Sequence, residues 1–246
     1  MQGIYSVKLN TTLWAATALL AGFLTGCGGG ESDDTPGSVP GVSDTEIVIG
    51  SHNDLSGPLA LIGVQAINGA RMRFDEANEA GGIHGRQIRF IVEDSQYQVP
   101  RAIQAANKLV RRDDIFAMFM GIGTPMNNAI MPMLFEHGVL NLFPASGARS
   151  MTEPFHDLQF VGLDQYYMQI RAALQHYFDN EGKKVPCVIY QDSDFGQEIL
   201  DGAMAEVSER GMQMAAVSAH KPTDTEFTTT IMRLRTAGCD VVAMGT

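Results

Sequence analysis

Residues 115–143 read IFAMFMGIGTPMNNAIMPMLFEHGVLNLF, and this stretch contains the pattern that decides the fold. It opens with an apolar run over residues 115–120, continues with a helical pattern over residues 124–137 and ends with a second apolar run over residues 139–143. A continuous apolar run is typical of a strand that is buried on both faces, as the strands of parallel sheets are. The stretch therefore predicts a strand–helix–strand unit whose two strands are parallel.

The same alternation extends to both sides of this unit. Two short runs, at residues 46–51 and 87–93, precede it, and each is followed by a helical pattern; a short strand is expected at residues 159–162. The alternation then restarts, with further strands expected at residues 185–191, 213–219 and 240–244 and with helical patterns before and between them. We therefore predict an α/β protein with two lobes, residues 45–163 and residues 164–246, each a parallel sheet flanked by helices.

The second lobe differs from the first at its end. The last expected strand has the composition of a central, buried strand, and the sequence ends at Thr246, directly after it. A doubly wound lobe normally places a helix over such a strand. We therefore expect this lobe to be incomplete, because of a C-terminal truncation of the sequence.

The composition excludes several classes of protein. The 246 residues include 28 acidic and 17 basic side chains, which gives a formal net charge of −11, so we expect no nucleic-acid partner. The hydrophobic share of 45% is typical of a globular chain. Three cysteines are too few for a disulfide-rich miniprotein.

The first 26 residues resemble a bacterial lipoprotein signal peptide. Residues 13–24 (LWAATALLAGFL) are apolar, but as a helix they span only about 18 Å, whereas the hydrocarbon core of a membrane is ~30 Å thick. The next residues, Thr25-Gly26-Cys27, complete a sequence similar to a lipobox, in which the signal is cut before a cysteine that carries a diacylglyceryl group. We expect an exported protein, periplasmic or at the cell surface, whose membrane contact is the lipid on Cys27. An ordinary signal peptide that exports the chain without a lipid is the alternative.

Residues 27–44 contain mostly Gly, Ser, Pro and acidic residues, and they predict a flexible tether. The other two cysteines, Cys187 and Cys239, each lie beside an apolar run. Because free cysteines are often buried in such runs, we expect two free thiols. A disulfide between them, in an oxidising compartment, is the alternative.

A series of short motifs resembles one family. The motifs are LSGP at residues 55–58, NEAGGIHG at 78–85, AANKL at 105–109, FPAS at 143–146 and DSDFG at 192–196. In this order and spacing they are similar to the leucine/isoleucine/valine-binding family of type I periplasmic binding proteins, from about residue 45 to residue 246. The resemblance implies a two-lobed receptor of an ABC importer, which closes by a hinge motion on a small carboxylate or amide, such as a branched-chain amino acid, and docks on the permease subunits. A sensor of the same fold that acts on a signalling partner is the alternative.

The ligand site is expected at the carboxyl ends of the strands, where open parallel sheets bind their ligands. Thr124 and Pro125 directly follow the apolar run at residues 115–120, and they favour a helix start with Thr124 as its cap. The free N–H groups and the positive dipole end of such a helix suit a carboxylate. By alignment with the family, Thr124, Ala145 and Gly147 hold this carboxylate, and Ser146 supplies the hydroxyl that the family often has at the position of Gly147.

Four further residues are expected near the ligand through the same resemblance. Phe195 matches an aromatic residue that packs on the ligand from the second lobe, with packing into the core of that lobe as the alternative, and Ile62 matches a lid position. Asp164 and Tyr166 lie at the crossover between the lobes, where a structural role in the hinge is the alternative. An acidic residue that recognises an α-ammonium group lies, in the family, beyond the position of Thr246. For Arg149 we expect a solvated side chain, with a carboxylate clamp as the alternative.

The patterns of enzymes are incomplete in this sequence. Gly121 and Gly123 lack the third glycine of a dinucleotide-binding loop, and Ser146 is not in a GxSxG motif. The six histidines have no metal-ligand spacing, and we expect them at the surface or at helix caps. We therefore expect no catalytic residue, no cofactor and no metal. An exported α/β enzyme that acts on a small amide or ester is the third hypothesis.

Overall fold

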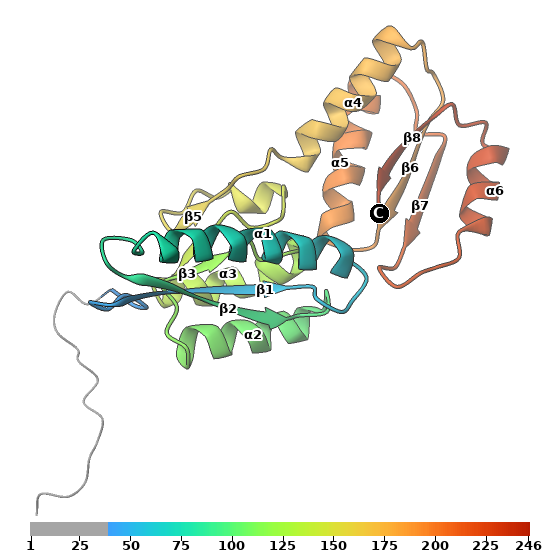
Figure 1. Ribbon diagram of the computed structural model, residues 1–246. Coiled ribbons are helices and arrows are strands. Elements are labelled where there is room, and N and C mark those ends of the chain that lie inside the picture. The colour runs from blue at the N-terminus through green and yellow to red at the C-terminus, as the bar shows by residue number, and fades with distance from the viewer. Residues whose placement is uncertain (1–38) are drawn as a thin grey trace, which may run out of the picture. The chain divides into compact units, whose positions relative to one another are not determined.

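The computed structural model describes residues 39–246 of the chain. The predicted signal peptide, Cys27 and most of the predicted tether lie outside the described residues. Residues 39–246 contain a five-stranded sheet in the order β2-β1-β3-β4-β5 and a three-stranded sheet in the order β7-β6-β8, shown in Figure 1. All strand pairings within the two sheets are parallel, which confirms the predicted fold class.

We call the part from β1 through β5 the first lobe and the part from α4 through β8 the second lobe. The first lobe contains, in chain order, β1 (Glu46–Asn53), α1 (Ala60–Glu79), β2 (Gln87–Asp94), α2 (Val99–Arg111), β3 (Ala117–Phe119), α3 (Thr124–Glu136), β4 (Leu140–Leu142), the 3-10 helix η1 (Arg149–Met151) and β5 (Gln159–Phe160). The second lobe contains α4 (Tyr166–Asn180), β6 (Pro186–Gln191), α5 (Asp194–Glu209), β7 (Ala216–His220), α6 (Thr228–Thr236) and β8 (Val241–Gly245).

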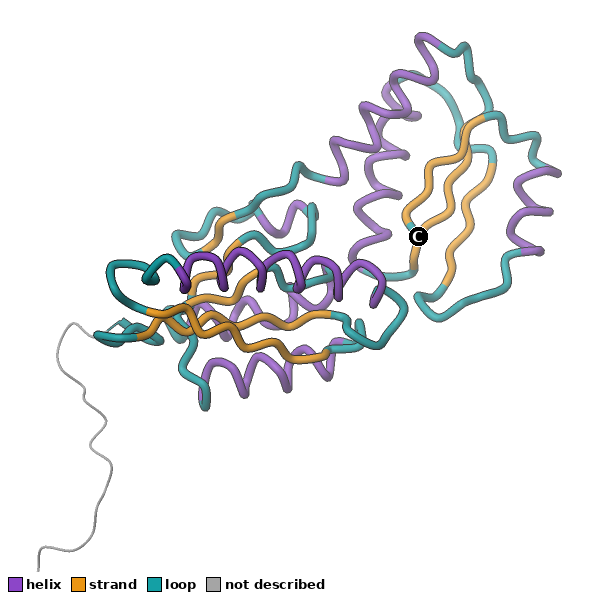
Figure 2. The backbone as a smooth tube through the Cα atoms, in the orientation of Figure 1, coloured by secondary structure: helices purple, strands orange, loops and turns teal. Residues whose placement is uncertain are grey.

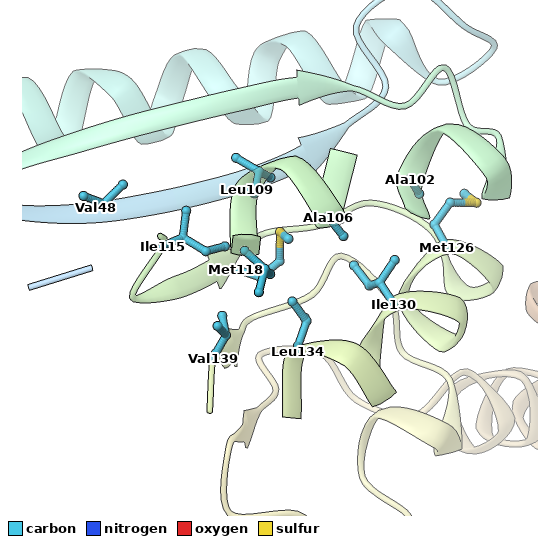
Figure 3. Packing of buried hydrophobic residues seen from close by; sticks show 11 residues of the cluster. Val48, Ala102, Ala106, Leu109, Ile115, Met118, Met126, Ile130, Leu134 and Val139 are labelled. Carbon is cyan, nitrogen blue, oxygen red and sulfur yellow. The ribbon is translucent and has the colours of Figure 1, made fainter. Parts of the chain in front are cut away.

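Helices cover both faces of each sheet. Figures 1 and 2 show α1 on one face of the five-stranded sheet and α2 and α3 on the other. The first core lies under α2 and α3, where Figure 3 shows Leu109, Ile130 and Leu134 pointing toward Ile115 and Met118. In the second lobe, α4 and α5 cover one face and α6 the other, and the side chains of Leu174, Val188, Ile199 and Ala243 fill the space under α4 and α5.

The strand that opens the deciding stretch is shorter than expected. It comprises Ala117–Phe119 rather than residues 115–120. Before the strand, the N–H of Ile115 donates to the carbonyl of Leu109 in α2. After the strand, Met120 has a φ of 54°, which ends the extended conformation. Ile115 is nevertheless fully buried in the first core. The left-handed turn at Met120 directs the next residues toward the carboxyl edge of the sheet.

The structure joins Cys187 and Cys239 in a disulfide, so the expectation of two free thiols is wrong. The reason is the register of the second sheet. Cys187 lies on β6, Cys239 comes two residues before β8, and these two strands are paired neighbours. Their Cα atoms are 5.8 Å apart, which is within the range that a disulfide spans.

Residues 39–44, the last part of the predicted tether, contact the first lobe. Gly41 is buried, its N–H donates to Asp114 Oδ2 at 3.3 Å, and its carbonyl accepts from the N–H of Val48 at 2.8 Å. Its φ is 69°, and a Cβ at this position would lie 2.1 Å from the backbone nitrogen of Phe116. Only glycine fits this position. Because Gly41 is also buried and hydrogen-bonded to the first lobe, it is part of the packed lobe.

In the part of the chain from residue 39 onward, the structure contains no helix that is both long and apolar enough to span a membrane.

Candidate functional site

A cavity of about 290 Å³ lies at the carboxyl ends of the strands, between the first and second lobes. It is where the open-sheet rule places a ligand. Every side chain that lines it, among the described residues, is uncharged: Leu59, Ile62, Tyr97, Ile122, Gly123, Thr124, Ala145, Leu163, Tyr166, Gln191, Phe195 and Thr246. The walls are therefore mainly aliphatic and aromatic, and we call this space the cleft cavity.

The N-terminus of α3 forms the polar end of the cleft cavity. Gly123, with a φ of 97°, is the N-cap, and Thr124 and Pro125 are the first two helical residues. The prediction of Thr124 as the cap is thus wrong by one position, because the left-handed turn needs a glycine there. The first turn of a helix leaves its N–H groups without helical acceptors, and Thr124 supplies one of them beside its hydroxyl.

A buried hydroxyl pair supports Thr124 from behind. Thr124 Oγ1 lies 2.7 Å from Ser146 Oγ, which also accepts from the N–H of Ala148 at 3.3 Å. Ser146 is almost fully buried and is absent from the cavity wall. The structure therefore places Ser146 where it orients the Thr124 hydroxyl, rather than in the wall itself.

Ala145 and Gly147, which were both predicted to hold the carboxylate, lie at different places relative to the cleft cavity. Ala145 lines the cleft cavity, but its N–H already donates to the carbonyl of Gly121 at 2.9 Å. Gly147 lies behind the wall, where a Cβ would be 2.4 Å from the carbonyl oxygen of Asp164. Asp164 itself is exposed and outside the wall. Of this group, the structure brings Ala145 alone to the cavity beside Thr124.

The side chains expected to pack on a ligand lie around the same space. Tyr166 and Phe195 meet edge to face, with ring centroids 5.2 Å apart, and Ile62 forms part of the wall from α1. Burial raises the pKa of the Tyr166 phenol, so this group stays neutral. The cleft cavity therefore contains an aromatic pair opposite the first lobe.

Tyr97 and Gln191, which were not among the residues expected at the site, join the lobes across the cleft cavity. The Tyr97 hydroxyl donates to Gln191 Oε1 at 3.5 Å, and burial raises the pKa of Tyr97 to about 12. A Cβ at Gly123 would lie 2.8 Å from the Tyr97 ring, so this ring packs directly over the start of α3. The position of Tyr97 just after β2, at the carboxyl edge of the sheet, was the signal that could have identified it.

Two carboxylates hold the loop that connects β1 to α1 and carries Leu59 to the cavity. Asp54 accepts from the N–H groups of Gly57 at 2.5 Å and Leu59 at 2.7 Å. Asp94 accepts from the N–H of Leu55 and from the hydroxyl of Ser56. Burial alone would raise the pKa of Asp94, but these hydrogen bonds outweigh it and the pKa is lowered. The LSGP motif is thus the segment that both carboxylates fix.

Arg149 is only partly exposed, and it is absent from the wall of the cleft cavity. Its guanidinium donates to both oxygens of Glu198, at 3.2 and 3.0 Å, and to Asp201 Oδ2 at 2.7 Å. It also lies 4.5 Å from the centroid of the Tyr167 ring. The partly exposed guanidinium is thus held by carboxylates of α5 and by Tyr167 of α4 rather than by solvent alone, and the structure does not place it as a clamp on a ligand carboxylate.

His52 is also not at the surface or at a helix cap. It is fully buried on β1, and burial lowers its pKa to about 4, so it is neutral at physiological pH. A Cβ at Gly121 would lie 2.4 Å from His52 Nε2, so the imidazole packs directly against the backbone of Gly121. Within residues 39–246, no three His, Cys, Asp or Glu side chains gather in a way that could hold a metal ion.

Comparisons with known proteins agree with this architecture. A model of the periplasmic binding protein family matches residues 46–246. The Leu/Ile/Val-binding protein BraC3 of Rhizobium johnstonii is 27% identical over 209 residues, which cover 83% of this chain and 55% of that protein. A leucine-, isoleucine-, valine-, threonine- and alanine-binding protein of Pseudomonas aeruginosa is 26% identical and is matched over 81% of this chain and 53% of its own length.

Solved structures of similar proteins share this fold. A substrate-binding periplasmic protein from Ralstonia solanacearum superposes with a TM-score of 0.76 at 25% identity, over 82% of this chain and 57% of that one. A fatty acid ABC transporter substrate-binding protein from Thermomonospora curvata has a TM-score of 0.76 at 21% identity, over 85% and 53% of the two chains, which shows a shared fold alone. The chain spans about half the length of the curated relatives that it matches.

Proposed function

Because this chain belongs to the periplasmic binding protein family, we propose that it is the exported solute receptor of an ABC importer and binds a small ligand in the cleft cavity. The observation that carries the proposal is the N-terminus of α3, which opens into an uncharged, mainly apolar space between the two lobes. In this function the chain is a receptor and not an enzyme. Its partners are the ligand and the permease.

We propose a ligand with one carboxylate or amide end and an apolar body. The free N–H groups at the start of α3 and the Thr124 hydroxyl suit an anionic or polar oxygen. The side chains of Ile62, Tyr166 and Phe195 suit an aliphatic body such as that of a branched-chain amino acid. The names of the relatives from Rhizobium johnstonii and Pseudomonas aeruginosa support this class of ligand.

Closure of the two lobes on the ligand completes the proposed mechanism. The Tyr97–Gln191 contact joins the lobes directly across the cleft cavity, and at 3.5 Å it has room to shorten. A ligand that touches Thr124 in one lobe and Phe195 in the other stabilises the closed arrangement through contacts that only this arrangement makes.

A thermal-shift panel tests the proposal on the 246-residue chain. The panel contains leucine, isoleucine and valine, other amino acids, benzoate-like acids and short amides. At a thousandfold excess over Kd, a ligand adds about 4 kcal/mol to the free energy of unfolding. For a chain of this size, the melting temperature then rises by roughly 8–16 °C.

A rise with one chemical class supports the receptor and identifies its ligand. A cooperative melting transition that none of these compounds moves contradicts the proposed ligand class. Turnover of an amide or ester during the assay contradicts the non-enzymatic function.

A further inference from the structure

The cleft cavity has a polar group in the second lobe, the side-chain amide of Gln191. This residue is the last one of β6, the central strand of its sheet, and it lines the cavity at the carboxyl end of that strand. Gln191 is only 6% exposed. A polar side chain that is buried to this degree needs hydrogen-bond partners for its amide oxygen and its amide nitrogen.

The oxygen of this amide is already occupied. Ser193 Oγ donates to Gln191 Oε1 at 2.7 Å, and the Tyr97 hydroxyl donates to the same atom at 3.5 Å. Ser193 is the N-cap of α5 and its Oγ accepts from the N–H of Gly196, so the hydroxyl proton of Ser193 is free for Gln191. An amide oxygen has two lone pairs, and these two donors use both of them.

The nitrogen of the amide is the unpaired end. Within residues 39–246 no group accepts a hydrogen bond from Gln191 Nε2, and this nitrogen is not sealed from the surface. Because Gln191 lines the cleft cavity, Nε2 presents its N–H groups to that space. A Cβ at Gly196 would lie 1.9 Å from the backbone oxygen of Gln191, so the first turn of α5 packs directly behind this residue. The second lobe thus offers a fixed donor to a ligand.

This donor lies close to the N-terminus of α3, as the position of Tyr97 shows. The Tyr97 ring would lie 2.8 Å from a Cβ at Gly123, and its hydroxyl contacts Gln191 Oε1. One edge of a phenol ring and one hydrogen bond therefore separate the start of α3 from the Gln191 amide. Two ligand oxygens that bind these two places lie close together on the ligand, as oxygens on neighbouring carbon atoms do.

We propose that Gln191 determines the ligand class, because it binds a neutral oxygen next to the ligand carboxylate, and that the preferred ligand is an aliphatic 2-oxo or 2-hydroxy acid. This inference rests on the receptor function proposed above and specifies its ligand. The carboxylate binds at Thr124 and the second oxygen accepts from Gln191 Nε2. An ammonium group has N–H donors only, so it gains nothing from a donor at this place.

Three acids that differ only at the carbon next to the carboxylate test this proposal. That carbon has an oxo group in 4-methyl-2-oxopentanoate, an ammonium group in leucine and hydrogens alone in 4-methylpentanoate. Isothermal titration of each acid into the 246-residue chain measures its affinity. We expect the oxo acid to bind at least about fivefold more tightly than 4-methylpentanoate, as the gain of one hydrogen bond implies, and more tightly than leucine.

The variant Gln191→Glu keeps the shape of the side chain and the acceptor for Ser193, but it replaces the donor Nε2 by an oxygen. All three acids carry a carboxylate, so the added negative charge weakens their binding alike, and the ratios of their affinities isolate the group on the neighbouring carbon. The preference for the oxo acid over 4-methylpentanoate should disappear. Leucine should gain about fivefold or more relative to both, because its ammonium donates to the new carboxylate.

A second variant and a control complete the experiment. Gln191→Met has neither a donor nor a charge, so it should abolish the preference for the oxo acid without favouring leucine, and it serves as the test if Gln191→Glu does not fold. Gln175→Glu adds the same charge at an exposed position of α4 and should leave all three ratios unchanged.

Leucine or 4-methylpentanoate binding as tightly as the oxo acid would overturn the inference. So would a preference for the oxo acid that both Gln191 variants retain. In these cases a ligand still binds, so the proposed receptor function stands. If a folded chain binds none of the three acids, the ligand class proposed for the receptor fails together with this inference.

Discussion

Thr124 has two partners in the proposed receptor, the buried hydroxyl of Ser146 and the ligand. The 2.7 Å contact between the two hydroxyls fixes the direction of Thr124 Oγ1 before any ligand arrives. We expect Thr124→Ala to weaken the binding of a carboxylate ligand by roughly 1–3 kcal/mol, because a hydrogen bond to a charged group is lost. Isothermal titration of the ligand found in the thermal-shift panel measures the change.

Thr124→Ser is the control for this variant, since it keeps the hydroxyl and should bind nearly as the parent does. An unchanged affinity in Thr124→Ala would remove Thr124 from the ligand site.

His52 makes the stability of the chain depend on pH. Its pKa is about 4 in the fold and 6.5 in the unfolded chain, so above pH 6.5 it is neutral in both states and has no effect. As the pH falls from 6.5 to 4, the unfolded chain takes up a proton and the folded chain does not, so the free energy of unfolding decreases by up to roughly 3 kcal/mol.

Urea denaturation at a series of pH values measures this slope in the parent and in His52→Gln, which is close to histidine in volume and does not titrate. The variant should lose less stability between pH 6.5 and 4. Equal slopes would mean that His52 is not the group responsible. His176→Gln, at an exposed histidine, is the control.

Single residues were predicted where one local pattern decides their position. The glycine, threonine and proline of residues 123–125 place the helix start within one position, because backbone preferences act locally. Arg149 and Tyr97 were not predictable in this way. Their partners, Glu198 and Gln191, come from the other lobe, and no spacing in the sequence encodes that approach.

At the scale of elements, Arg149 connects η1 to α5 through two carboxylates. The guanidinium and its partners are partly exposed, so solvent screens the ion pairs. We expect Arg149→Ala to lower the free energy of unfolding by about 1–2 kcal/mol, because both pairs and the packing on Tyr167 are lost together. Hydrogen exchange should also become faster in α5.

Arg73→Ala is the matched control, since it removes one exposed ion pair within α1. This variant should lower the free energy of unfolding by less than about 0.5 kcal/mol. If both variants lower the free energy of unfolding by the same amount, the contact between η1 and α5 stabilises the fold no more than an ordinary surface ion pair does.

The order and type of the elements were predictable because the apolar periodicity of each segment is strong. The disulfide and the packing of Gly41 were not. Both depend on which segments become neighbours: β6 beside β8, and residues 39–44 beside the turn at Asp114. Such pairings form only in the folded sheet, and one sequence does not specify them.

At the scale of the whole molecule, we propose that Cys27, which lies outside the described residues, carries a lipid that holds the receptor at the membrane. The lipobox-like sequence before it supports this proposal. We expect Cys27→Ser to abolish the incorporation of labelled palmitate, because the thiol that accepts the diacylglyceryl group is gone. Cys187→Ser leaves Cys27 intact and is the control. Labelling that persists in Cys27→Ser would contradict the lipid anchor.

The bridge between Cys187 and Cys239 has a consequence for biogenesis. Oxidation of the two thiols requires a compartment outside the reducing cytoplasm. Before secretion, the second sheet therefore lacks a cross-link that spans 52 residues and stabilises it by roughly 4 kcal/mol in the chain-entropy description. A nascent chain with this weakened lobe is easier to keep unfolded and to thread through a translocation channel. Once the two thiols are oxidised outside the cytoplasm, the cross-link stabilises the folded lobe, which then unfolds less readily.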